Sequence, residues 1–265
     1  MTNEVYWRLG CFFSILIIMM LLEWQKPARK SPVKASTRWF ANFSLVLISS
    51  VAARLIVPIG LTALAIYNTE QGIGLFNLLA LPMWLVIILS FLLLDMLIYW
   101  QHRLFHQVPL LWRLHKVHHA DPHVDTSTGL RFHPIEIVLS ILIKLTVITI
   151  LGVPALAVLV FEIVLNGFAL FNHANIRLPK RLEHLLRLLI ITQQLHRIHH
   201  SQRPDETNSN YGFSVVWWDK VFKSYKKAAT LTDDNLNIGL KEFRRVNENS
   251  RLWTLLKIPF IKKQI

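Results

Sequence analysis

Hydrophobic residues in the first hundred positions are gathered into long runs that are typical of helices crossing a membrane. The runs cover residues 6–24, 42–67 and 77–100, and each is long enough for a hydrocarbon core that needs about 20 apolar residues. Arg54 and Pro58 interrupt the second run. The pattern predicts three transmembrane helices in this part of the chain.

The first run also has an alternative interpretation as a cleaved secretory signal peptide. Such peptides begin with basic residues and end in small residues at the cleavage site. This run lacks a basic start, and bulky and basic residues follow it in the segment 24–30. A retained transmembrane helix is therefore favoured.

A further apolar stretch, residues 135–171, is too long for one helix. Gly152 and Pro154 lie near its middle, where they favour a turn. The pattern predicts a hairpin of two helices, 135–151 and 154–171. Each has about 17 residues, at the short end for a membrane span, so the hairpin is expected to cross in a tilted way or only in part.

Charged residues also lie inside these apolar runs, among them Arg54, Lys144 and Glu162. Charges within a membrane are costly and usually face other parts of the protein or extend toward the interface. Lys144 and Glu162 of the hairpin are therefore expected to face protein or to snorkel. Arg54 is interpreted as a snorkelling residue rather than as part of an ion pathway.

Composition supports a membrane protein and excludes several other classes. Hydrophobic residues make up 53% of the 265 residues and charged residues 17%, against about 25% charged residues in an average soluble domain. The net charge of +13 would also suit a nucleic-acid-binding protein, but the apolar content is too high and too clustered for that class. The single cysteine, Cys11, excludes a disulfide framework, a zinc–cysteine site, an iron–sulfur cluster and a covalently attached haem.

The basic residues are unevenly distributed and orient the predicted helices. Of the 29 Lys and Arg residues, 26 lie in the segments 25–41, 101–134 and 172–265. The predicted helices place these three segments on one side of the membrane, which the positive-inside rule identifies as the cytoplasm. The N-terminus and the connection 68–76 then lie outside.

These patterns together predict an all-α integral membrane protein. About three transmembrane helices occupy residues 1–100, and a catalytic region, residues 101–265, contains the helical hairpin. A cytoplasmic helical cap at 172–265 is expected to hold a histidine-rich dinuclear metal site, and the whole chain is functionally a single domain. The bacterial inner membrane and the endoplasmic reticulum share the same charge bias. Residues 262–265 carry no endoplasmic-reticulum retention signal, which favours the bacterial inner membrane.

Histidine is the most informative residue type in this chain. There are 12 histidines, and none lies in the first 101 residues. Eight of them form three clusters whose members are three or four positions apart. On a helix this spacing projects from one face, so each cluster is expected to aim its rings at a common point. The clusters are His102 with His106, His115 with His118 and His119, and His196 with His199 and His200.

Eight imidazoles predict two metal ions rather than one. Imidazole is a good ligand for zinc, iron, copper and nickel, and eight nitrogens exceed the capacity of a single ion. Neutral ligands leave the charge of the ions uncompensated, so polar or acidic residues are expected beside the rings to orient them. His123 and His184 are interpreted as ordinary core or surface residues. The candidates for orienting the rings are Asp95, Asp121, Asp125, Glu136, Asn172, Asp205 and Asp219.

The residues that flank the clusters extend the pattern over about 95–222. The segments that carry it are 95–106, 111–121, 128–136, 172–175, 196–201, 210–212 and 218–222. In sequence and order they resemble the fatty acid hydroxylase superfamily, also called the sterol desaturase family. One departure is Lys223-Ser224, where the family often has Gly-Thr. The short gap 107–114 between the first two clusters favours this family over the acyl-lipid desaturases.

The resemblance implies two iron ions, O2 as co-substrate and a lipid substrate. The reaction is then hydroxylation or desaturation of a C–H bond in a sterol, fatty acyl chain, ether lipid or carotenoid. No dinucleotide-binding Gly-x-Gly-x-x-Gly is present, so a separate ferredoxin-like or cytochrome b5-like carrier with its reductase is expected to donate electrons. The implied iron ligands are His102, His106, His115, His118, His119, His196, His199 and His200, with His173 as a ninth and His133 as a further candidate.

Two other classes of protein also use clustered histidines. A metal transporter or other membrane metal-binding protein is one alternative, but transport sites usually lie near the bilayer midplane, whereas these histidines follow the ends of the apolar runs. A structural zinc protein is the other, and it needs only four ligands. The sequence therefore favours the oxygen-dependent enzyme.

Overall fold

The computed structural model describes residues 3–243, 247 and 250–261. Within these residues, the secondary structure consists of helices and two isolated β-bridges, and there is no β-strand. The all-α prediction is confirmed for this part of the chain. The segment 262–265, which was used to argue for a bacterial membrane, lies outside the described residues.

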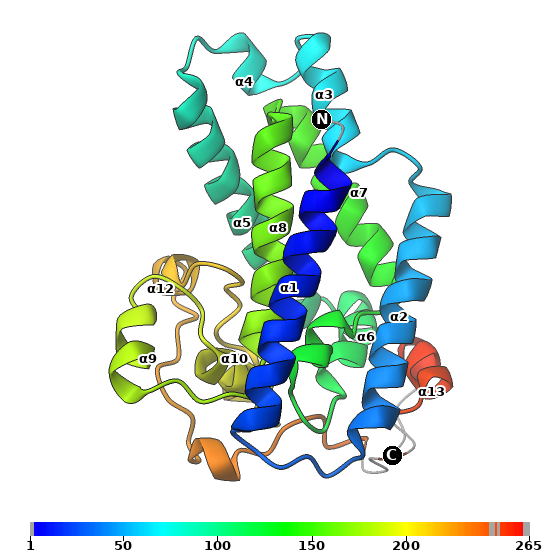
Figure 1. Cartoon of the computed structure of the whole chain (residues 1–265), viewed down its shortest axis with the longest axis vertical. Helices are drawn as coiled ribbons and strands as arrows, with labels where there is room; N and C mark the ends of the chain where they lie inside the picture. Colours follow the sequence, from blue (N-terminus) through cyan, green and yellow to red (C-terminus); the bar gives the residue numbers. More distant parts are fainter. Residues whose placement is uncertain (1–2, 244–246, 248–249, 262–265) are drawn as a thin grey trace.

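Five long helical stretches form a bundle that follows the vertical direction of Figure 1. Each is long and apolar enough to cross a membrane, which indicates an integral membrane protein. Neighbouring helices pack as α1 on α8, α2 on α7, and α5 on α8. The long helices are α1 (Glu4–Gln25), α2 (Ala35–Ile56), α5 (Met83–Gln107), α7 (Pro134–Leu151) and α8 (Ala155–His173).

Proline residues set two helix boundaries differently from the prediction. The run 42–67 is not one helix, because it breaks around Pro58 into α2 and α3 (Leu61–Glu70). The run 77–100 begins instead with the last residues of α4 (Leu75–Leu78), and α5 starts only after Pro82. Proline lacks the backbone N–H that a helix interior requires and is tolerated in the first turn. At its C-terminal end, α5 extends seven residues further than expected, to Gln107, and carries the first histidine cluster.

The hairpin of α7 and α8 is confirmed, and glycine makes its turn possible. Gly152 ends α7 with φ 66°, a left-handed conformation that glycine adopts without steric cost. The turn packs closely against Gly74, where an added Cβ atom would lie 2.2 Å from the Gly152 nitrogen. The hairpin tip therefore meets the α3–α4 connection at the end of the molecule that also holds the N-terminus (Figure 1).

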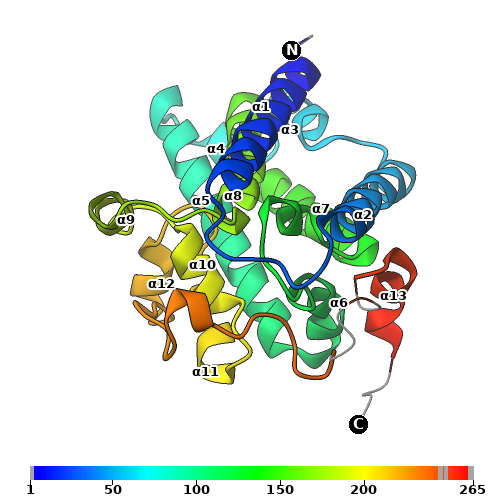
Figure 2. The same cartoon turned by 60° about the horizontal axis from the view of Figure 1, so that its bottom comes forward.

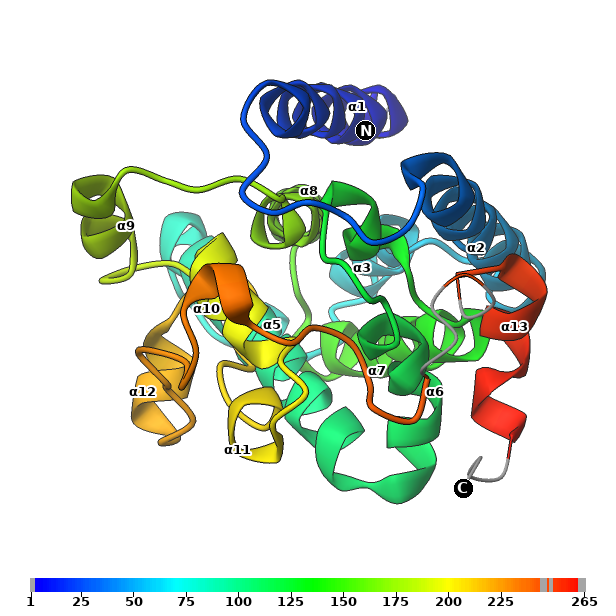
Figure 3. The same ribbon diagram turned by 90° about the horizontal axis from the view of Figure 1, so that it is seen from below.

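Apart from α3 and α4, the short helices gather at the opposite end of the bundle, as the views turned toward this end show (Figures 2 and 3). The segments 25–41 and 101–134 and the described part of 172–265 all lie there, so the described basic segments share one end of the bundle. These elements are α6 (Pro109–His119), η1 (Thr126–Leu130), α9 (Lys180–Leu186), α10 (Gln193–His199), α11 (Pro204–Thr207), α12 (Trp217–Val221), η2 (Asp233–Asn235), α13 (Leu252–Lys257) and η3 (Ile258–Phe260).

Two buried polar clusters fasten the long helices to this end. Near the end of α1, the Glu23 carboxylate accepts hydrogen bonds from the backbone N–H and hydroxyl of Thr126 and from the Asn175 backbone N–H, at 2.6–2.7 Å. In α2, the Arg38 guanidinium donates to both oxygens of Asp121 at 2.8 Å and to Asp125 at 2.5 Å. The segments on either side of the histidine clusters are thereby held in place.

Candidate metal centre

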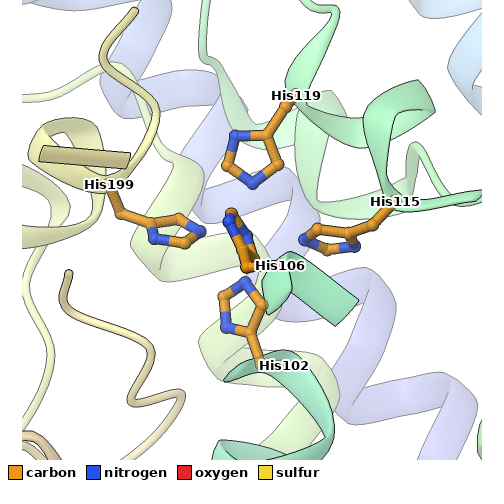
Figure 4. A group of neighbouring side chains, drawn as sticks. All are labelled: His102, His106, His115, His119 and His199. Carbon is orange, nitrogen blue, oxygen red and sulfur yellow. The ribbon is translucent and has the colours of Figure 1, made fainter. Parts of the chain in front are cut away.

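Nine histidines converge into two neighbouring groups, and within each group the candidate ligand atoms all lie within 4.8 Å of one another. Figure 4 shows the rings of the first group directed toward a common centre. These nine are the eight cluster histidines and His173. The first histidine group consists of His102, His106, His115, His119 and His199, and the second of His118, His173, His196 and His200.

The groups do not follow the three sequence clusters, which corrects the expectation that each cluster points at one place. The α5 pair does so, but α6 sends His115 and His119 to the first group and His118 to the second. Adjacent helical residues differ by about 100° in direction, so His118 and His119 must diverge. The same spacing at α10 sends His199 to the first group, whereas His196 and His200 belong to the second.

In the first group, hydrogen bonds fix which ring nitrogen is free. His102 Nδ1 lies 2.9 Å from the Tyr211 carbonyl, and His199 Nδ1 lies 2.8 Å from the Ser209 carbonyl. Because a carbonyl only accepts, Nδ1 carries the proton and donates, and Nε2 keeps its lone pair. Nε2 of all five rings is buried without a hydrogen-bond partner among the described residues. Five unpartnered ring nitrogens that lie this close together are a donor set that could hold a metal ion.

In the second group, the ring nitrogens face one another at short range. His173 Nε2 lies 3.1 Å from His118 Nε2 and 2.9 Å from His196 Nε2, which in turn lies 3.3 Å from His200 Nε2. Nitrogens bound to one ion at about 2.0–2.1 Å are separated by about 2.8–3.4 Å, depending on the coordination geometry. The spacing therefore fits four ligands of a single ion. His173 Nδ1 donates to the Ala169 carbonyl at 2.6 Å, which fixes that ring's tautomer.

Burial keeps the three histidines of the third sequence cluster in the neutral form that binds metals. Desolvation lowers the pKa of His199 to about 3. The pKa values of His196 and His200 also lie well below the ordinary value, first because of burial and then because of neighbouring histidines. At neutral pH these three rings carry no proton that a metal would have to displace from the lone pair.

Glu136 and Asp219 lie beside the first group, as expected for residues that orient its rings. The Glu136 carboxylate accepts a hydrogen bond from His115 Nδ1 at 2.7 Å. Asp219 accepts from the backbone N–H groups of Tyr211 and Gly212, each at 2.8 Å, and thus holds the residue whose carbonyl binds His102. Burial raises the pKa of Asp219 to about 6.

The other expected orienting residues have different partners. Asp95 binds α12, Asn172 binds the loop between α11 and α12, and Asp205 lies on the surface. Asp121 and Asp125 belong to the buried cluster around Arg38. The partners are the Trp218 indole for Asp95, the Phe213 carbonyl for Asn172, the Arg38 guanidinium for Asp121 and Asp125, and the Lys226 ammonium for Asp205.

Three histidines lie in neither group. His133, the further candidate ligand, caps α7: its Nδ1 accepts from the Ile135 N–H at 3.2 Å, and its Nε2 lies 3.3 Å from the Leu256 carbonyl. Both nitrogens are therefore engaged. His123 is buried in the core, and His184 is exposed on α9.

Two aromatic residues beside the first group were not among the predicted site residues. The Trp112 ring lies 4.9 Å from the His106 ring and 5.4 Å from the His119 ring. Tyr211 lies 5.3 Å from His106. Trp112 precedes His115 by three residues, and this helical spacing could have indicated it. Tyr211 comes from a distant loop and has no such signal.

Removal of the Glu136 carboxylate is expected to weaken metal binding at the first group. Glu136→Ala leaves the His115 Nδ1 proton without its acceptor, and the loss of such a partner typically costs about 10- to 100-fold in metal affinity. Metal retained during titration with a chelator measures the effect, and Glu136→Gln should fall between Ala and wild type. Glu242→Ala removes only a surface partner of Lys116, the residue next to His115 on α6, and serves as the control. Equal losses of metal in both variants would contradict a role of Glu136 in orienting His115.

A cavity of about 340 Å³ lies against both groups and extends between the long helices. His102 and His115 of the first group and His118 and His196 of the second line one end. Phe105 and other apolar residues of α1, α2, α5, α7 and α8 line its walls. A mainly apolar pocket with a few polar groups is typical of a small-molecule site, and this one leads from apolar helices to the histidines.

Comparison with known proteins was made on the whole chain. The family model described as fatty acid hydroxylase matches residues 87–224, just over half of the chain. The ornithine lipid hydroxylase OlsE of Rhizobium tropici is 26% identical over 227 residues, which cover 84% of this chain and 68% of the relative. Alkylglycerol monooxygenase of Danio rerio is 27% identical over 221 residues, covering 81% of this chain and 46% of the relative. The human alkylglycerol monooxygenase is 27% identical over 137 residues, covering 52% and 30%.

The chain thus spans about two thirds of the first relative and less than half of the other two. No solved structure matches it significantly.

Proposed function

Because the chain belongs to the fatty acid hydroxylase family, we propose that it is a membrane-bound, di-iron and O2-dependent oxidoreductase that acts on a C–H bond of a lipid. The observation that carries this proposal is the cavity that leads from apolar helices to two groups of converging imidazole nitrogens. The first group would hold one iron ion and the second the other. Five nitrogens in the first group exceed the four ligands of a structural zinc site, which supports an ion of higher coordination number.

Iron bound at these groups supplies the redox chemistry by which O2 is reduced and a C–H bond is oxidised. The protein orients the rings: Glu136 and the carbonyls of Tyr211 and Ser209 hold three of them through Nδ1. The apolar cavity walls exclude water and align one carbon of the substrate with the histidines.

The substrate is a lipid that enters from the bilayer between the long helices. The relatives are named as hydroxylases or monooxygenases of ornithine lipid and alkylglycerol, which favours hydroxylation over desaturation and an ether- or acyl-linked lipid over a sterol or carotenoid. In this proposal residues 101–265 carry the chemistry and residues 1–100 form the membrane scaffold, within one functional domain. The N-terminal helices also contribute residues to the cavity wall.

The basic end of the molecule would face the cytoplasm, as the positive-inside rule requires, in a bacterial inner membrane. An acidic electron carrier with its reductase would reach the histidine groups from this side, because opposite charges steer such encounters.

Metal analysis and O2 consumption test the proposal. Protein purified anaerobically is expected to contain about two iron ions per chain, the content of a dinuclear site, and to consume O2 with a reductant only when a suitable lipid is present. One tightly bound zinc ion without O2 consumption would show a structural zinc site. Metal uptake into vesicles without lipid oxidation would show a transporter.

A further inference from the structure

The end of the cavity remote from the histidines is lined by charged residues inside the apolar helices. Lys144 of α7, Glu162 of α8 and Arg8 of α1 all contribute to its wall. Lys144 and Glu162 are only 8% and 6% exposed, so both face protein, as the sequence led us to expect. Three helices that are far apart in sequence thus bring three charges to one cavity.

The charges in this cluster are unequally paired. Arg8 forms an ion pair with Glu162 at 3.2 Å and also approaches Glu4 at 3.5 Å. Lys144 makes no hydrogen bond and no ion pair with any residue that the structure describes, although the Glu162 carboxylate favours its charged form through a longer-range electrostatic interaction. One buried ammonium group therefore remains without a direct partner and lines the cavity.

A buried, unpaired charge is costly and is retained mainly where it has a function. A well-packed apolar residue would serve stability at this position equally well or better. Another polar group in the same cavity is also unused, because the Ser49 hydroxyl of α2 is buried and lacks a partner among the described residues. Both side chains are donors, which suits a ligand with negatively charged oxygen atoms.

We propose that Lys144, beside the Arg8–Glu162 pair, binds an acidic oxygen group of the lipid substrate, a carboxylate or a phosphate. This inference rests on the proposed function, since it assigns the cavity to the substrate. Glu136, which contacts a histidine of the first group, and Lys144 are eight residues apart on α7, or about 12 Å along the helix. The acidic group is therefore held roughly that far from the histidines, and this separation selects which carbon reaches them.

Binding of single-chain amphiphiles tests this site. Full-length protein in an uncharged detergent is titrated calorimetrically with dodecanoate, dodecyl phosphate and 1-dodecanol, without O2 or reductant. Wild type is expected to bind at least one acidic probe about 10- to 100-fold more tightly than the alcohol, the ratio for a hydrogen bond to a charged group. The acidic probe that binds more tightly shows whether the site prefers a carboxylate or a phosphate.

The variants separate this site from general charge effects. Lys144→Met should abolish the preference for the acidic probe and Lys144→Arg should keep it, while Lys30→Met, which removes an exposed charge, should change nothing. Glu162→Gln removes the competing carboxylate and should strengthen binding of the acidic probe. This result tests the site even if Lys144→Met fails to fold. No preference in wild type, or an unchanged preference in folded Lys144→Met, would overturn the proposal.

The same titrations distinguish this inference from the proposed function. Lipid oxidation without any preference for the acidic probe refutes only the role of Lys144. A preference that depends on Lys144 in a protein that never oxidises a lipid supports this site and refutes the enzymatic proposal.

Discussion

Replacing His118 with alanine is expected to abolish lipid oxidation and to lower the metal content from about two ions per chain to about one, because only one group loses a ligand. His118 belongs to the four-nitrogen group, where its Nε2 lies 3.1 Å from His173 Nε2. The five nitrogens of the first group are unchanged by the substitution. Metal content by mass spectrometry and product formation from the lipid measure the two effects on the same preparation.

His184→Ala is the matched control, because this histidine is exposed on α9 and belongs to neither group. It should leave metal content and turnover unchanged. His199→Ala should remove the other ion, since His199 contributes to the first group. Full metal content and activity in His118→Ala would contradict its role as a ligand, and the same loss in His184→Ala would point to a general effect of the substitution on folding.

The second large effect is expected at the buried charge cluster of α2. Arg38→Met removes the cation that pairs with Asp121 and Asp125 and leaves both carboxylates buried, a change that typically costs about 3–5 kcal/mol. Burial by itself raises the pKa of Asp121, but Arg38 and Arg131 outweigh it and hold this pKa below its ordinary value. The free energy of unfolding in detergent at pH 7 should fall accordingly.

The pH dependence provides a second measurement on Arg38→Met. A carboxyl with a depressed pKa stabilises the fold above its unfolded value of 3.8, and this contribution is lost as the pH falls through the folded pKa. Wild type should therefore lose stability in acid, and the variant should lose much less. Arg54→Met, on the same helix but exposed, should stay within about 0.5 kcal/mol of wild type. Equal destabilisation by both substitutions would contradict the importance of the buried pair.

Local patterns predicted the helices and the histidines of this protein well. Apolar runs locate α1 and the hairpin because nearly every residue of such a helix meets lipid or other apolar groups. The predicted end of α2 and the predicted start of α5 were wrong. Pro58 follows the end of α2 and Pro82 precedes the start of α5, but the apolar pattern continues through both prolines. Hydropathy reports burial in the membrane and carries little information about a backbone break.

The division of the histidines into two groups depends on the direction in which each ring leaves its helix, and the grouping by sequence position did not take this direction into account. His118 and His119 are neighbours in sequence, yet their rings point about 100° apart on the helix. The hydrogen-bond partners of His102 and His199 could not be predicted either, because Tyr211 and Ser209 accept through their backbone carbonyls. Any residue type supplies a carbonyl, so no sequence pattern marks it. Only the tertiary fold brings these loops to the histidines.

Because α6 and α10 each contribute to both groups, the pitch of the α-helix sets the spacing between the two histidine groups. Substitutions in the membrane-facing helices can change the shape of the cavity without altering this spacing. A single inserted or deleted residue within His115–His119 or His196–His200 would instead rotate part of the histidine set by about 100°. If the cavity holds the substrate as proposed, such chains can diversify their substrates in evolution while tolerating no change of length in these two short helices.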